Sequence, residues 1–190
     1  MENFLKQNKL FTTTNIIYCA LFTALITIGA FIQIPVLYMD YFTLQFFFIL
    51  LAGILLGSKL GSLAVLLYVV IGLAGLPVFA SGGGLGYLLR PSFGYLLGFI
   101  VGAYLTGFVS EKSAWSDVKK YALAVFCGLL ATYLIGLSYK YFILNYYVGT
   151  PISWKLVLLS CFPLDLPGDI FLSVITAGVG VRFKKRGLGC

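Results

Sequence analysis

The sequence predicts an all-α membrane protein with six transmembrane helices, and three observations lead to this fold class. Of the 190 residues, 61% are hydrophobic and only 10% are charged, whereas a soluble domain carries about 25% charged residues. The apolar residues form long segments without charge, and the charged residues form short clusters between them. One water-facing fold has no room to bury so much apolar surface, so we expect the segments to cross a bilayer.

Six apolar segments are candidates for the crossings. The first is near the lower limit of length, since about 1.5 Å per residue gives it about 25 Å. Only Ser58 and Lys59 separate the second from the third, which predicts a very short turn. The predicted spans are residues 16–32, 42–57, 60–79, 93–109, 121–139 and, after a broken beginning at 154–169, residues 170–183.

The broken beginning of the sixth span contains two prolines and two carboxylates in the run FPLDLPGD, residues 162–169. A proline inside a helix removes a backbone hydrogen bond. In lipid such a break persists only where protein or water satisfies the freed groups. We therefore expect the break to border a polar pocket, with the regular helix starting at residue 170.

The basic residues predict the orientation. With six crossings, ten of the 13 Lys and Arg residues fall on the face that carries both termini, and Arg90, Lys140 and Lys155 fall on the other. The positive-inside rule then predicts a multi-pass protein of the cell (plasma) membrane with both termini cytoplasmic. We expect a cytoplasmic N-terminal segment, residues 1–14, a single transmembrane domain, residues 15–187, and a tail, residues 188–190. The net charge of +7 thus indicates a membrane surface and not a nucleic acid.

A glycine-rich stretch, residues 75–95, interrupts the apolar segments on the predicted outer side. Its SGGGLG run, Ser81 to Gly86, permits two interpretations: backbone N–H groups that cradle an anion, or a flexible external loop. Arg90 favours the anion, because a guanidinium pairs with a carboxylate through two hydrogen bonds. No βαβ pattern surrounds these glycines, so they are not a dinucleotide-binding fingerprint.

Asp165 and Asp169 are the carboxylates of the break. A charge within an apolar segment is expensive and is commonly functional or paired. Asp169 could accept N–H groups of a neutral ligand such as a urea or an amide, or it could cap the helix that follows. Asp165 could bind the ligand or pair with Arg90 or Lys155.

Small residues recur at intervals of four, which allows helices to approach closely in lipid. On the fourth span these are Gly94, Gly98 and Gly102, where packing within the chain is the simpler interpretation. On the first span Ala20 and Ala24 form a similar stripe, with Gly29 and Ala30 nearby. That stripe could pack internally or could dock a partner helix.

No catalytic constellation is found. The chain has no histidine, and its sequence contains no metal-ligand cluster, no GxSxG and no P-loop. We therefore expect neither an enzyme nor a cofactor or metal, and any ATP-driven step would need another chain.

The sequence resembles the BioY family, the biotin-specific substrate-binding (S) components of energy-coupling-factor (ECF) transporters. The resemblance covers nearly the whole chain from the first span onward. It rests on Thr43-Leu44-Gln45, on the long run from Leu50 to Gly86 with its GLPVFA segment, on Pro91 with Gly94 to Phe99, and on Phe162-Pro163 with Pro167-Gly168-Asp169.

The resemblance implies an S-component-type bundle that captures biotin outside the cell. It also implies partners, namely a transmembrane coupling protein, which Ala20 and Ala24 would contact, and two ATPase subunits. Two positions depart from the family pattern: Arg90 stands where a glycine is common, and Leu172 stands where a lysine is common.

We accordingly predict a biotin site in which Asp169 accepts the ureido N–H groups. The Ser81–Gly86 backbone (Ser81, Gly82, Gly83, Gly84 and Gly86) and Arg90 would hold the ligand carboxylate. Gln45, Tyr87, Tyr95 and Asp165 complete the predicted set. The alternatives are an S component for another vitamin, a small membrane enzyme that uses Asp165 and Asp169, and a transporter that works without ATPase subunits.

Overall fold

Among the residues that the computed structural model describes, five helices are long and apolar enough, by length and composition, to cross a membrane. The structure describes residues 12–34, 42–161 and 165–185. In chain order the elements are α2 (Thr13–Phe31), β1 (Gln33–Ile34), β2 (Phe42–Thr43), α3 (Gln45–Leu73), η1 (Leu85–Leu89), α4 (Phe93–Lys112), α5 (Asp117–Phe142), η2 (Ile143–Tyr147), α6 (Trp154–Leu159) and α7 (Asp165–Lys185). The predicted tail, residues 188–190, and most of the predicted N-terminal segment, residues 1–14, lie outside the described residues.

The longest helix, α3, consists of two arms joined at a sharp turn. Gly57 has φ +80°, in the left-handed region that glycine adopts without steric cost. A Cβ on Gly61 would lie 2.8 Å from the carbonyl oxygen of Ala52, although nine residues of straight helix would separate these positions by about 14 Å. The chain therefore turns back at Gly57. The predicted second and third spans are these two arms, which bring the number of crossing segments to six.

Helix α2 packs against both arms of α3. The Thr23 hydroxyl donates to the Ala64 carbonyl oxygen at 3.0 Å, on the second arm. At the other end of α2, a Cβ on Gly29 would lie 3.0 Å from the Cα of Gln45, where the first arm begins. Each arm is therefore fixed to a different part of α2.

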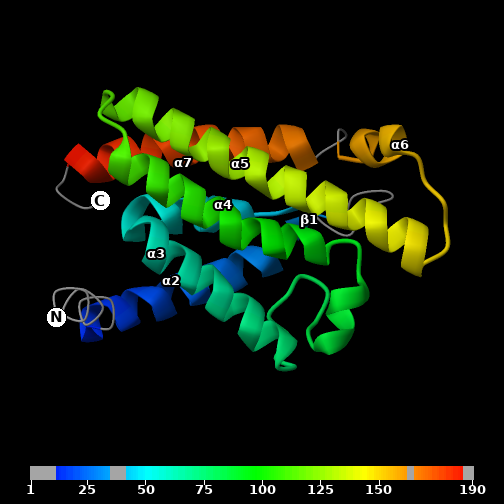
Figure 1. The fold of residues 1–190 in the computed structure, drawn as a ribbon. Coiled ribbons are helices and arrows are strands. Elements are labelled where there is room, and N and C mark those ends of the chain that lie inside the picture. The colour runs from blue at the N-terminus through cyan, green and yellow to red at the C-terminus, as the bar shows by residue number, and fades with distance from the viewer. Residues whose placement is uncertain (1–11, 35–41, 162–164, 186–190) are drawn as a thin grey trace, which may run out of the picture.

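The turn at Gly57 is closed by α4. The Glu111 carboxylate accepts the Ser58 N–H at 2.7 Å and the Ser58 hydroxyl at 2.9 Å. The start of α2 and the end of α7 lie at this same end of the bundle, whereas β1, η1 and α6 lie at the opposite end (Figure 1). The structure thus agrees with a topology in which both termini share one side.

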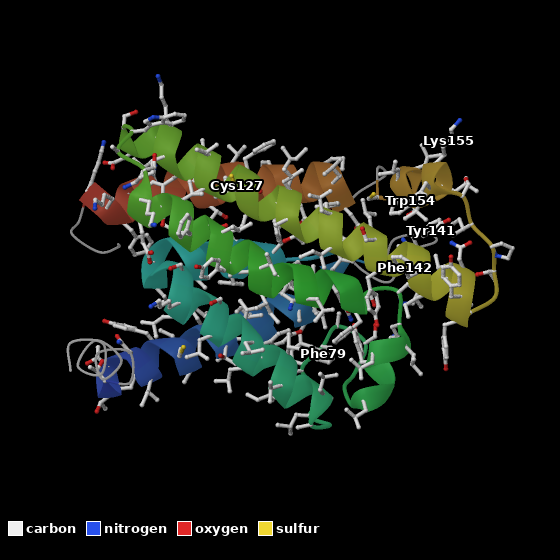
Figure 2. The ribbon with its side chains drawn as sticks, in the orientation of Figure 1. Phe79, Cys127, Tyr141, Phe142, Trp154 and Lys155 are labelled. Carbon is white, nitrogen blue, oxygen red and sulfur yellow. The ribbon has the colours of Figure 1, made fainter. Side chains whose placement is uncertain are left out.

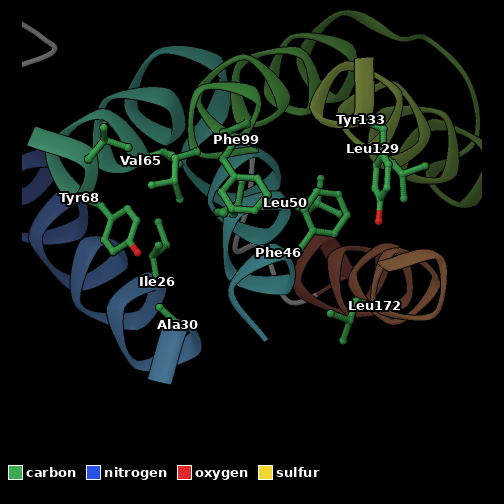
Figure 3. Close-up of a cluster of buried hydrophobic side chains, with 14 of the residues drawn as sticks. Ile26, Ala30, Phe46, Leu50, Val65, Tyr68, Phe99, Leu129, Tyr133 and Leu172 are labelled. Carbon is green, nitrogen blue, oxygen red and sulfur yellow. The ribbon is translucent and has the colours of Figure 1, made fainter. Parts of the chain in front are cut away.

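A buried apolar cluster runs across the bundle from α2 to α7. Figure 3 shows Ile26 of α2, Phe46 and Tyr68 of α3, Phe99 of α4 and Leu172 of α7 within it. Burying apolar side chains between helices leaves little internal space, so the arrangement of the helix ends is fixed by packing. Leu172 is only 6% exposed, so this position serves the core.

The glycine stripe of α4 packs against α5, as predicted. A Cβ on Gly98 would lie 2.7 Å from the Thr132 carbonyl oxygen, and one on Gly102 would lie 2.6 Å from the Thr132 hydroxyl. Only glycine permits this approach, which brings the two helices into close contact along their length.

Several predicted boundaries were wrong. Helix α3 ends at Leu73 and not at residue 79, because the chain turns back there as a loop with Phe79 bridged to Gly82. Helix α5 begins at Asp117, four residues before the predicted start. Helix α7 begins at Asp165, so Pro167 occupies its first turn, where a missing N–H costs nothing. Asp169 consequently lies inside the helix and does not cap it.

Candidate ligand-binding site

A cavity of about 420 Å³ opens at the end of the bundle that carries β2, η1 and α6. The first turns of α3, α4 and α7 meet the last turns of α5 there. Its lining residues are Phe42, Thr43, Gln45, Phe46, Ala80, Tyr87, Pro91, Ser92, Tyr95, Leu96, Phe99, Tyr133, Lys140, Leu144, Asp165 and Asp169. The walls are mainly aromatic, with a few polar groups that converge, which is the composition of a small-molecule site.

The structure brings five of the predicted site residues together in this cavity: Gln45, Tyr87, Tyr95, Asp165 and Asp169. It adds side chains that the sequence did not single out, notably Tyr133, Lys140 and Ser92. Tyr133, Lys140 and Leu144 are spaced by seven and four residues, so they lie on one face of a helix. That spacing in the sequence was a usable signal for these residues.

Asp169 is held by a neighbouring tyrosine. The Tyr133 hydroxyl donates to Asp169 Oδ2 at 2.8 Å, and the Tyr133 ring meets Tyr95 edge to face with centroids 5.8 Å apart. Within the described residues Asp169 Oδ1 accepts no hydrogen bond. Since α7 begins one turn earlier, both Asp165 and Asp169 project into the cavity from the same helix. The aspartate therefore presents one fixed oxygen and one oxygen available to a ligand.

Lys140 supplies the cation of the cavity. Its ammonium donates to the Ser160 hydroxyl at 2.9 Å, which ties the end of α5 to α6. The same two elements are joined by Tyr141 and Trp154, whose rings stack 4.4 Å apart (Figure 2). Lys140 and Tyr133 are seven residues apart, or about 10 Å along the helix. The cation and the Asp169 carboxylate thus mark two separate regions of one cavity.

Three uncharged polar groups of the lining have no hydrogen-bond partner within the described residues. They are the Gln45 amide nitrogen, the Ser92 hydroxyl and the Tyr95 hydroxyl, and all three are buried. Buried polar groups in native proteins are nearly always paired. Because these three face the same cavity, they suit a ligand or water that fills it.

The glycine-rich loop contributes less than predicted. Among its predicted residues, Ser81, Gly82, Gly83, Gly84, Gly86 and Arg90 do not line the cavity. The Gly82 N–H donates to the Phe79 carbonyl at 3.2 Å, and the Gly84 N–H donates to the Gly72 carbonyl at 2.7 Å. These N–H groups fold the loop against the end of α3, so they are not directed at an anion.

Arg90 is exposed, and its guanidinium carbon lies 5.2 Å from the centroid of the Tyr87 ring. The Tyr87 side chain itself is 5% exposed and lines the cavity. Arg90 therefore rests against the ring of a cavity residue without entering the cavity in this structure.

Ala20 and Ala24 are both exposed on α2, beside Ile17, Leu21 and Ile28. Gly29 and Ala30 are buried on the inward face of the same helix, so they do not extend the alanine stripe as expected. The exposed face is apolar, which fits either lipid or a partner helix.

Comparison with known proteins gives the family. Residues 5–188 match the model of the BioY family. The chain belongs to the BioY family. A probable biotin transporter BioY from Lysinibacillus sphaericus is 39% identical over 181 residues, which cover 95% of this chain and 90% of that protein. The biotin transporter BioY from Thermotoga maritima is 40% identical over 174 residues, 90% of this chain and 95% of that protein.

A solved structure shares the fold. The crystal structure of an S-component for biotin from an ECF-type ABC transporter matches with a TM-score of 0.70 and 28% identity, over 93% of each chain. BioY relatives and this fold identify the chain as a multi-pass membrane protein of a transporter and not as an enzyme.

Proposed function

We propose that this chain is the biotin-binding S component of an ECF-type transporter, which captures biotin at the outer face for ATP-driven uptake. The observation that carries the proposal is the cavity with Asp169 in one region and Lys140 in another. Membership of the BioY family supplies the identity of the ligand.

The ureido ring of biotin carries two N–H donors and a carbonyl. Asp169 accepts N–H groups through Oδ1, while Tyr133 holds Oδ2 in place. Charge-assisted hydrogen bonds of this kind are about twice as strong as neutral ones. Gln45, Tyr95 and Ser92 have buried polar atoms without partners among the described residues, and these atoms are available to the ureido oxygen and the ring.

The valerate carboxylate pairs with Lys140. An ammonium has three donors, and the Lys140 ammonium, which donates to the Ser160 hydroxyl at 2.9 Å, lines the cavity. The aromatic walls, among them Phe46, Tyr87 and Phe99, enclose the apolar middle of the molecule. In this arrangement Lys140 has the role that the sequence assigned to Arg90. Asp165, in the first turn of α7, lines the same cavity.

Isothermal titration of the purified chain with a panel of vitamins tests the assignment. Biotin binds and thiamine, riboflavin and folate do not, if the proposal is correct. Tighter binding of another vitamin would assign the chain to that ligand instead. Cleavage of a substrate that requires both Asp165 and Asp169, without ligand binding, would support the enzyme alternative.

The partners we propose are a transmembrane coupling protein and two ATPase subunits, with both termini of this chain cytoplasmic. The excess of basic residues near the Gly57 end of the bundle supports this orientation.

The exposed stripe of Ala20 and Ala24 is the proposed contact with the coupling protein, because small residues let helices approach closely. Replacing both alanines with leucine then abolishes co-purification with the coupling protein while biotin binding persists. Ala74→Leu, exposed at the other end of α3, is the matched control. Biotin uptake into proteoliposomes by the chain alone would contradict the need for these partners.

A further inference from the structure

A second cavity lies on the flank of the bundle. It has a volume of about 600 Å³ and runs between α5 and α7, which pack along each other (Figure 1). Among the described residues it shares no lining residue with the candidate biotin site. The proposed biotin-binding function therefore does not account for it.

The flank cavity is an apolar groove that faces outward. Val118 and Phe126 of α5 and Val174 of α7 line it and are 65%, 58% and 67% exposed. Small residues create the hollow: a Cβ on Gly178 would meet no atom within 4 Å. In a membrane-spanning bundle this groove opens to lipid.

One end of the groove is basic. Arg182 and Lys185 line it at the end of α7, and neither has an ion-pair partner among residues 12–34, 42–161 and 165–185. Among the described residues, no acidic side chain belongs to the lining. The nearest acid in the sequence of α5, Asp117, already faces Lys120 at 3.7 Å. An occupant would thus meet apolar walls along the groove and two cations at its end.

The length of the groove favours a lipid as its occupant. From Ile170 to Lys185 the groove extends about 22 Å along α7, close to the thickness of one leaflet with its headgroups, about 20–22 Å. One end of this length carries the two cations and the rest is mainly apolar, which matches the headgroup and the acyl chain of an anionic lipid.

We propose that this groove binds one anionic phospholipid. An acyl chain lies between α5 and α7 against Phe126 and Gly178, and the phosphate lies at Arg182 and Lys185. The basic end of the groove coincides with the end of the bundle where the basic residues gather. The lipid is therefore drawn from the leaflet on the side of the termini.

Native mass spectrometry of the delipidated full chain tests the proposal. Dioleoyl phosphatidylglycerol is compared with dioleoyl phosphatidylcholine, which has the same chains without a net charge. We expect one phosphatidylglycerol per protein at concentrations where phosphatidylcholine does not bind. Equal binding of the two lipids would overturn the proposal.

Two sets of variants locate the lipid. Each basic residue near a membrane surface contributes about fivefold in affinity for anionic lipid, so Arg182→Gln with Lys185→Gln weakens phosphatidylglycerol binding by about 25-fold. Lys184→Gln removes a charge from the same helical turn but not from the lining, and it serves as the control with a smaller effect. Gly178→Leu fills the groove and reduces the binding of both lipids.

Biotin titration checks that each variant is folded, because the biotin site lies elsewhere. If Gly178→Leu fails to fold, the charge variants alone decide. Full phosphatidylglycerol binding by the double variant would overturn the proposal. The proposal would also be overturned if these variants still bound lipid but no longer co-purified with the coupling protein. That result would make the groove a protein-docking surface.

Discussion

Two interruptions of the helical pattern lie at the end of the bundle that holds the cavity, and they contribute to the cavity in different ways. The loop between α3 and α4 is rich in glycine, yet its N–H groups bond to its own neighbourhood: Gly82 to Phe79 and Gly84 to Gly72. A Cβ on Gly83 would lie 2.2 Å from the Leu76 carbonyl oxygen. Gly82, Gly83 and Gly84 are thus required for the fold of this loop.

The break before α7 works in the opposite way. Pro167 and Gly168 are absorbed into the beginning of the helix, and the carboxylates of the break line the cavity. Asp165 and Asp169 line the cavity from successive turns of α7. The comparison teaches that the side chains on helix ends define the site, whereas the loop mainly shapes its rim through Ala80, Tyr87 and Pro91.

The largest effect is expected at Asp169. Asp169→Asn keeps the shape of the side chain and removes its charge. The side-chain amide N–H can then face the ureido N–H groups, and a donor cannot accept a hydrogen bond from another donor. Hydrogen bonds to a charged group are worth about 1.5–3 kcal/mol, so we expect biotin affinity to fall by about 100-fold in isothermal titration. An unchanged biotin affinity of Asp169→Asn would show that the start of α7 does not bind the ligand. The glycine-rich loop would then be the more important of the two interruptions.

Lys140 is expected to have the second largest effect. Lys140→Gln weakens biotin binding by about tenfold, the value of one charge-assisted bond. Biotinamide, which lacks the carboxylate charge, separates pairing from packing. The wild type discriminates biotin from biotinamide and the variant does not, since interacting pairs give non-additive energies.

Lys155 is the matched control for this experiment. It is exposed at the same end of the bundle and points away from it (Figure 2). Lys155→Gln leaves both ligands unaffected. If it reduces biotin binding as much as Lys140→Gln, the effect arises from the general surface charge and not from a specific pair.

Tyr133 tests whether the fixed oxygen of Asp169 matters. Tyr133→Phe removes a neutral hydrogen bond of 2.8 Å and leaves the ring against Tyr95. A net hydrogen bond is worth about 1 kcal/mol, so biotin affinity falls by about fivefold. Tyr104→Phe, on an exposed face of α4, is the control. A larger loss than at Asp169 would mean that Tyr133 itself contacts the ligand.

The sequence was sufficient for the fold class and for the end of the bundle that holds the site. Charge-free segments and the distribution of lysine and arginine are local properties of the chain. Asp169 could also be predicted, because a carboxylate in an apolar segment is costly wherever the helices lie. The contributions of Lys140 and Tyr133 could not, since they depend on the rotation of α5 against α7. The glycine loop was overestimated because a glycine-rich run does not reveal which N–H groups the fold itself uses.

The smallest effect is expected at Arg90, and it separates the two interruptions most sharply. Arg90 is exposed, and its guanidinium lies over the Tyr87 ring. Exposed charges contribute little to interaction energies. Arg90→Gln therefore changes biotin affinity by about twofold or less and preserves the preference for biotin over biotinamide. Lys140→Gln in the same assay supplies the opposite result. If Arg90→Gln instead abolished that preference, the loop would have to rearrange on binding and bring its guanidinium to the carboxylate. The anion site would then belong to the glycine-rich loop, as its sequence first indicated.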